Sequence, residues 1–256
     1  MASDAAQHWQ KIRPSTRAWE QFDDPHGRPT TPVRVLKEGV PYVLEADFPP
    51  HFEAGDHWHP HDTIYLFTAG EMRVGDEGTY RPGDVRWVRA GHVYGPEVAG
   101  PDGVRFTLIS LGGPIELHWA DLEAPPDSLP RADGRKLWGR ANIDATPAEH
   151  FPDPAGRPTQ PVRNLCADDP YILHTTFSPG FSAGEHWHDY DTLYFITDGR
   201  MRFGNEGWYE AGDVRWVRGG HSYGPEEPGP EGVSFLLVSC GGPIALRWSD
   251  LEPPPR

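Results

Sequence analysis

The sequence is poor in cysteine, in positive charge and in long apolar runs. Its 256 residues include two cysteines, Cys166 and Cys240, and neither is in a C-x-x-C pair, so a disulfide framework and a cysteine-rich zinc site have no support. We expect two buried thiols that form no disulfide, in a cytoplasmic protein. No run approaches the roughly 20 apolar residues of a membrane-spanning helix, and residues 1–15 lack the apolar segment of a secretory signal.

Other functional classes lack their usual signals. The formal net charge of −15 disfavours a nucleic-acid partner, because an acidic surface repels phosphate groups. The chain has no G-x-G-x-x-G or G-x-x-x-x-G-K-[ST] phosphate loop, no G-x-S-x-G elbow and no H-E-x-x-H helix. Glycine and proline are abundant at 29 each, which favours short strands joined by turns over long helices.

The sequence repeats itself with an offset of 129 residues and no gap. GDVRWVRAGHVYGPE, which begins at Gly83, returns as GDVRWVRGGHSYGPE at Gly212, and 28 of 43 positions are identical between residues 55–97 and 184–226. The match extends back to Trp9 and Trp138. We therefore predict two tandem domains, residues 1–127 with an N-terminal tail and residues 128–256 with a linker segment at their start.

Each copy is predicted to be all-β. TIYLFTAG, EMRVG, DVRWV and VRFTLISL alternate in polarity, are rich in aromatic and β-branched residues, and end near Gly, Pro or Asp, as strands of about 4–8 residues do. No stretch keeps a 3.6-residue period over three turns. The pattern predicts a sandwich or barrel of about 110–130 residues in each copy.

Histidines at alternate positions are the strongest functional signal. HWHPHDTIYLFTAG, from His57, returns as HWHDYDTLYFITDG, from His186. Residues i and i+2 of a strand share a face, so His57 and His59 project together, as do His186 and His188. Two neutral imidazoles make half of a transition-metal site, and the third ligand must come from elsewhere in the chain.

The histidine spacing resembles the cupin superfamily, and the whole chain resembles a bicupin. The first family motif is Gly, five residues, His-x-His, three or four residues, Glu, six residues and Gly. The second copy matches it with Gly180, His186, His188 and Gly199, whereas His51 stands at the leading glycine of the first copy. The glutamate of the family falls on Thr63 and Thr192, which is a departure because threonine is a poor metal ligand.

The second cupin motif also departs at its end. Its final histidine falls on Tyr94 and Tyr223, while His92 and His221 lie two residues earlier. A displacement of two keeps the face of a strand, so these histidines are candidates for a shifted third ligand. The alternative is that they stand just outside the ligand set, with the tyrosines near the metal and involved in catalysis.

The resemblance implies two double-stranded β-helix (jelly-roll) barrels and one divalent transition metal in each, with Fe(II) favoured and Zn(II) or Ni(II) as alternatives. His61 is a further candidate, present in the first copy only, since Tyr190 stands at its place in the second. The candidate ligands are His57, His59, His61, His92, His186, His188 and His221, and the candidate catalytic residues are Tyr94 and Tyr223.

The function expected from the resemblance is an Fe(II) oxygenase that acts on a small aromatic or dicarbonyl compound. Two alternatives remain: a non-redox zinc or nickel cyclase or isomerase, and a non-catalytic bicupin that binds a small ligand. The expected partner is therefore a small molecule, with neither nucleic acid nor membrane involved. A homodimer and a monomer are both compatible with the sequence.

Overall fold

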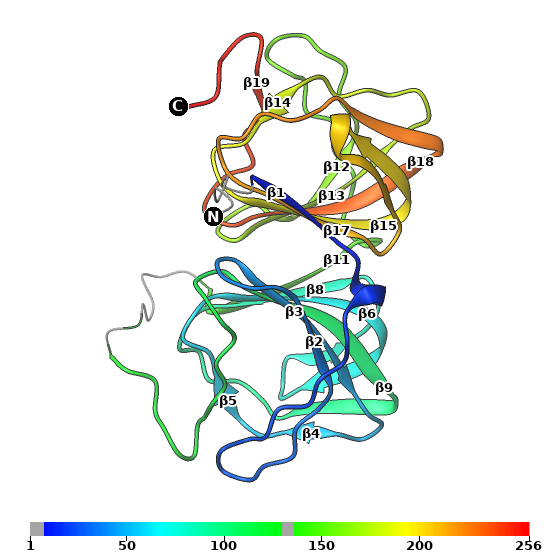
Figure 1. Ribbon diagram of the computed structural model, residues 1–256. Helices are drawn as coiled ribbons and strands as arrows, with labels where there is room; N and C mark the ends of the chain where they lie inside the picture. Colours follow the sequence, from blue (N-terminus) through cyan, green and yellow to red (C-terminus); the bar gives the residue numbers. More distant parts are fainter. Residues whose placement is uncertain (1–7, 128, 130–135, 256) are drawn as a thin grey trace, which may run out of the picture. The chain divides into compact units, whose positions relative to one another are not determined.

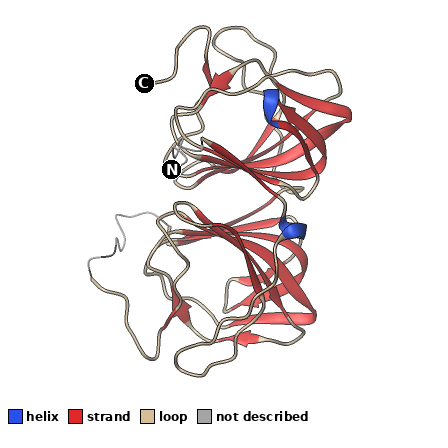
Figure 2. Ribbon diagram, in the orientation of Figure 1, coloured by secondary structure: helices blue, strands red, loops and turns tan. Residues whose placement is uncertain are grey.

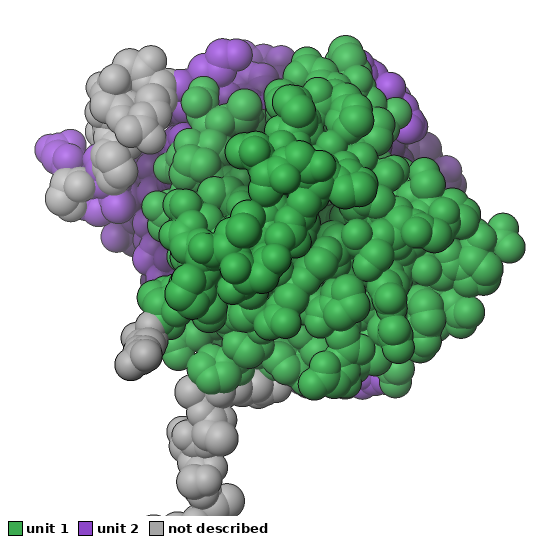
Figure 3. Space-filling view, turned by 90° about the horizontal axis from the view of Figure 1, so that it is seen from above, with its two compact units in different colours: residues 1–14, 146–256 green, residues 15–145 purple. Residues whose placement is uncertain are grey.

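The computed structural model describes residues 8–127, 129 and 136–255. The chain is built from β-strands and folds into two compact units (Figures 1 and 2). One unit consists of residues 15–145, and the other of residues 146–256 together with the N-terminal arm up to Pro14 (Figure 3). Among the described residues, no helix is long and apolar enough to cross a bilayer.

The unit of residues 15–145 forms the N-terminal barrel. Its main sheet has the strand order β11-β8-β6-β9-β3-β2, with β4 paired to β9 and β7 paired to β6, and β5 and β10 form a separate two-stranded sheet. All of these pairs are antiparallel. The strands are β2 (Val33–Lys37), β3 (Tyr42–Phe48), β4 (Glu53–Ala54), β5 (His57–Trp58), β6 (Thr63–Val74), β7 (Gly78–Tyr80), β8 (Asp84–Val88), β9 (Glu97–Ser110), β10 (His118–Trp119) and β11 (Trp138–Asn142).

The C-terminal barrel repeats this arrangement. Its main sheet runs β1-β17-β15-β18-β13-β12, with β16 paired to β15, and β14 pairs with β19. The elements are β1 (Trp9–Ile12), β12 (Val162–Cys166), β13 (Tyr171–Phe177), β14 (His186–Trp187), β15 (Thr192–Phe203), η2 (Gly204–Glu206), β16 (Gly207–Glu210), β17 (Val214–Val217), β18 (Glu226–Ser239) and β19 (Arg247–Trp248). The short 3₁₀ helix η1 (Pro14–Thr16) spans the chain boundary between the two units. The predicted all-β fold with an internal repeat is confirmed.

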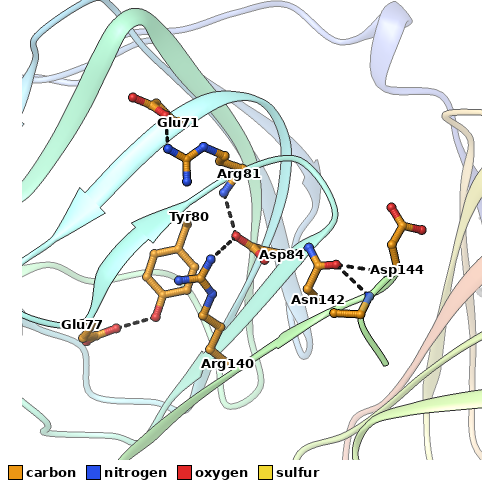
Figure 4. A network of polar contacts seen from close by, with 9 residues as sticks. Glu71, Glu77, Tyr80, Arg81, Asp84, Arg140, Asn142 and Asp144 are labelled. Atoms are coloured by element: carbon orange, nitrogen blue, oxygen red, sulfur yellow. Dashed lines mark hydrogen bonds and ion pairs between the residues drawn. The ribbon is translucent and has the colours of Figure 1, made fainter. Parts of the chain in front are cut away.

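The edge strands are exchanged relative to the predicted domains. Strand β1 pairs with β17 of the C-terminal barrel, and its counterpart in the repeat, β11, pairs with β8 of the N-terminal barrel. Strand β11 is fixed by the buried Asp84 carboxylate, which accepts a hydrogen bond from Arg140 (Figure 4). The donor–acceptor distance is 2.6 Å for Arg140, and Asn142 donates to the same carboxylate at 2.9 Å. The units therefore differ from the predicted domains at 1–127 and 128–256, since each takes its edge strand from across the expected seam.

The long strand β6 shows why one glycine recurs in both copies. The predicted strands at 63–70 and 71–75 form one strand, because Gly70 bends the chain without ending the strand. Gly70 has a φ of +67°, and a Cβ there would lie 2.0 Å from the carbonyl oxygen of Gly103. The register of β6 against β9 shifts on both sides of Gly70, as at a β-bulge.

The core of each barrel is aromatic. In the N-terminal barrel Tyr65 and Phe67 of β6 pack against Phe106 of β9, with ring centroids 5.2 and 5.7 Å apart. These side chains belong to one buried cluster with residues of β3, β7 and β8. Cys166 and Cys240 form no disulfide, as predicted, but both are half-buried and not fully buried as expected.

Candidate metal and substrate site

The histidine pair of the N-terminal barrel is fixed by the backbone. Nδ1 of His57 donates to the carbonyl oxygen of Gly55 at 2.7 Å, and Nδ1 of His59 donates to that of Glu116 at 2.6 Å. In this tautomer each Nε2 carries a lone pair. The two rings lie 5.4 Å apart, so they project together as the i, i+2 spacing predicts. Burial lowers the pKa of His57 to about 4 and that of His59 to about 3, which keeps both rings neutral.

The C-terminal barrel reproduces this geometry. His186 donates from Nδ1 to the carbonyl oxygen of Gly184 at 2.7 Å, and His188 donates to that of Ala245 at 2.7 Å. Their rings are again 5.4 Å apart, and burial lowers both pKa values to about 4. The two copies of the repeat therefore keep one site architecture.

Tyr94 lies beside this pair. Its backbone exchanges two hydrogen bonds of 3.0 Å with His57, and the two rings lie 4.5 Å apart. Its hydroxyl is 2.5 Å from that of Tyr65, and burial raises the pKa of both phenols, so both stay protonated. The Arg86 guanidinium packs over the Tyr94 ring at 4.1 Å and is held by a bidentate ion pair to Glu77. Tyr223 has the same contacts with His186, Tyr194 and Arg215.

Glu97 is a residue that the sequence analysis missed. Its carboxylate oxygen Oε2 lies 3.9 Å from Nε2 of His57, and the side chain is buried at the start of β9. Oε1 has no hydrogen-bond partner. Burial raises the pKa of Glu97 to about 7, although Arg86 and a hydrogen bond from Tyr65 act against this shift. Glu226 lies 3.8 Å from His186 in the same way, and its pKa is also raised by burial.

A cavity of about 380 Å³ opens onto the N-terminal histidine pair. His57, His59, Tyr65 and Glu97 line its polar part, and Phe48, Phe52, Phe106, Leu108 and Trp119 are among its apolar walls. Residues 22–25 and 29–31 of the segment before β2 also line the cavity. Trp119 fixes this segment, because its Nε1 donates to Asp24 at 2.9 Å and Arg28 packs over its ring at 4.4 Å.

The other predicted ligands have different surroundings. His92 lines a separate pocket with Asp56, Glu77 and Trp138, so the structure does not bring it to the His57 pair in that cavity. His221 stacks on His8 with ring centroids 4.9 Å apart. The His61 ring lies against a pair of glycines, where a Cβ on Gly112 would be 2.4 Å from its Nδ1. Tyr190 packs on the matching glycines of the second copy, which indicates a packing role at this position.

Comparisons with solved structures identify the fold. A proposed dioxygenase from Nostoc punctiforme superposes with a TM-score of 0.73 at 15% identity, over 91% of this chain and 82% of that one. The Bacillus subtilis oxalate decarboxylase, which has Mn(II) centres, superposes with a TM-score of 0.65 at 14% identity, over 92% of this chain and 78% of that one. The chain has the cupin fold. No family model matches the sequence, and no curated protein does.

The Bacillus subtilis oxalate decarboxylase has Mn(II) centres, and the donor chemistry of this chain fits a divalent metal in part. Metal-binding histidines usually donate their second ring N–H to a carbonyl or carboxylate, as all four do here. The buried Nε2 atoms of His59 and His188 have no hydrogen-bond partner. In the described part of the chain, however, no group of three or more His, Cys, Asp or Glu side chains could hold an ion as it stands. Each barrel therefore offers two imidazole donors for a metal ion.

Proposed function

We propose that this cupin is a metal-dependent enzyme that binds a divalent transition metal at His57 and His59 in the N-terminal barrel, and at His186 and His188 in the C-terminal one. The observation that carries the proposal is the pair of buried imidazoles whose Nδ1–H groups are committed to backbone carbonyls. This arrangement leaves two Nε2 lone pairs at an aromatic-walled cavity. A bound metal would supply Lewis acidity and, as Fe(II), the activation of dioxygen.

The residues around the pair prepare the site for a small organic substrate. The carbonyls of Gly55 and Glu116 hold the imidazoles in the metal-binding tautomer before any metal arrives. Tyr65 and Tyr94 remain neutral, and the Tyr65 hydroxyl lines the cavity beside Glu97, where its oxygen can accept a hydrogen bond. Glu97 offers an acceptor beside His57. Apolar side chains form the other walls of the same space.

We propose oxygenation of a small aromatic or dicarbonyl compound as the reaction. Two protein donors per ion leave room for a substrate that chelates through two oxygens and for dioxygen. The similarity to a proposed dioxygenase supports this class of reaction. The test is oxygen consumption by iron-loaded protein with a panel of β-diketones and hydroxyaryl ketones. Uptake above background supports the proposal, and background uptake across the panel with two irons bound contradicts it.

The buried Glu97 favours a second candidate, a non-redox cyclase or isomerase with zinc or nickel. A carboxylate with one unpartnered oxygen, beside neutral imidazoles and phenols, is suited to proton transfer. The same panel distinguishes the two, because this reaction would proceed anaerobically and consume no oxygen. A non-catalytic binding protein would bind the compounds and return them unchanged under both conditions.

A further inference from the structure

The lining of the N-terminal cavity ranges from buried to exposed. The histidines and Glu97 belong to its buried part. Phe22 and Leu117 also line the cavity, but they are 55% and 42% exposed. Exposed apolar side chains that line a cavity mark a binding surface more often than isolated ones do. Solvent therefore reaches the lining at Phe22 and Leu117, whereas the histidines and Glu97 are shielded from it.

The charge of the cavity lining also restricts the substrate. Its charged residues are Asp23, Asp24 and Glu97, and none of the lining residues is Lys or Arg. Asp24 is occupied, because it accepts hydrogen bonds from the Trp119 indole and from two backbone N–H groups. Arg28 is paired with Asp121 at 2.7 Å. A substrate with a carboxylate beyond its reacting end would find no cationic partner at this lining.

We infer that the substrate of this barrel is an uncharged aryl compound with its oxygen-bearing group at the histidines and its ring against Phe22 and Leu117. This inference rests on the proposed function and adds the substrate class and two residues that determine specificity. The volume of about 380 Å³ accommodates a single-ring compound. Phe22 and Leu117 do not touch the reacting group, so they set the affinity for the ring alone.

A matched pair of ligands tests the inference. Acetylacetone and benzoylacetone carry the same dicarbonyl group and differ by a phenyl ring in place of a methyl group. Any interaction of the dicarbonyl with a metal or with the histidines therefore cancels in the ratio of their dissociation constants. The ratio is measured by titration calorimetry on the full chain, both metal-free and iron-loaded. The His186→Gln/His188→Gln background restricts the measurement to the N-terminal barrel.

We expect benzoylacetone to bind about tenfold or more tightly than acetylacetone, because a buried phenyl ring removes more apolar surface from water than a methyl group. The Phe22→Ser/Leu117→Ser change should bring the ratio to about threefold or less and leave the affinity for acetylacetone within about twofold. Both positions are exposed, so folding should persist, and circular dichroism checks this. Phe151→Ser, at the matching position of the second copy, is the control and should leave the ratio unchanged.

Equal affinities in the parent, or an unchanged ratio in the Phe22 and Leu117 variant, would overturn the inference. If turnover of either diketone persists in that case, the inference of a ring subsite is wrong and the proposed enzymatic function still holds. If neither compound binds, the inference and the proposed substrate both fail. If the two compounds bind with the expected ratio but neither is turned over, the result supports the ring subsite and contradicts the proposed reaction.

Discussion

His59 donates from Nδ1 to the carbonyl oxygen of Glu116 at 2.6 Å, and this bond links the histidine pair to the loop before β10. The same loop supplies Ile115 and Leu117 to the cavity. One short segment therefore fixes the tautomer of a candidate ligand and forms part of the substrate surface. The second copy has the same bond between His188 and Ala245.

Glu97→Gln should change the pH dependence of stability in metal-free protein. The raised pKa means that the native state binds more protons than the unfolded state between about pH 4.5 and 7, so the contribution of Glu97 is present at low pH and is lost as the pH rises to about 7. Glutamine has no such loss. Relative to wild type, the variant should gain up to about 3 kcal/mol between pH 5 and pH 8. Urea unfolding measures this, and parallel stability profiles would contradict it.

The strand exchange predicts which fragments fold. A fragment of residues 15–145 contains β11, which covers the edge of β8, and should fold alone. A fragment of residues 1–127 carries β1 in place of β11, and should be less stable or aggregate. Thermal unfolding followed by circular dichroism compares the two. Equal stability of both fragments would show that the exchange contributes nothing.

The anchor of β11 joins the buried Asp84 carboxylate to the exposed Arg140 guanidinium. Asp84→Ala removes the hydrogen bonds from Arg140 and Asn142 and should destabilise the N-terminal unit by about 2 kcal/mol. Asp47→Ala is the control, since its pair with Arg105 is largely exposed and its loss should cost less than about 1 kcal/mol. Chemical unfolding of the two variants should therefore give clearly different midpoints, and similar midpoints would be evidence against the anchor.

The conformation of the segment before β2 depends on hydrogen bonds to Asp24. Asp24→Ala removes three hydrogen bonds, including the one from the Trp119 indole, and should increase amide exchange across residues 22–30. The apparent affinity for benzoylacetone should fall severalfold, because this segment carries Phe22. Asp121→Ala, which removes only the exposed pair to Arg28, should have a smaller effect on both. Amide exchange is measured by mass spectrometry. If it does not change in Asp24→Ala, Asp24 does not fix this segment.

The repeat and the period of the strands were sufficient to predict two all-β units and the placement of His57 beside His59, whereas the jelly-roll fold was predicted from the family resemblance. The hypothesis for His92 assumed a regular strand, whereas Tyr94 forms only an isolated bridge to His57 and His92 lies in no strand. Glu97 was missed because it is 40 positions from His57 and its burial depends on the pairing of β4 with β9. Its signal was present, since the phrase GHxYGPE ends with glutamate in both copies.

The exchanged edge strands could not have been predicted from the repeat. Trp9 and Trp138 are equivalent positions of the repeat. The sequence would therefore show the same 129-residue repeat whether or not the two strands were exchanged. The outcome depends on which barrel each strand meets, and that is a property of the packed structure. The same symmetry explains why the two histidine pairs have equal geometry.

Metal content is the measurement that tests the central claim most directly. Iron- or zinc-loaded protein, freed of excess ion and analysed by mass spectrometry, should hold about two ions per chain, and His57→Gln/His59→Gln should hold about one. His92→Gln, which alters a histidine in a different pocket, should keep both. Wild-type protein without metal, or an equal loss on changing His92 alone, would contradict the account.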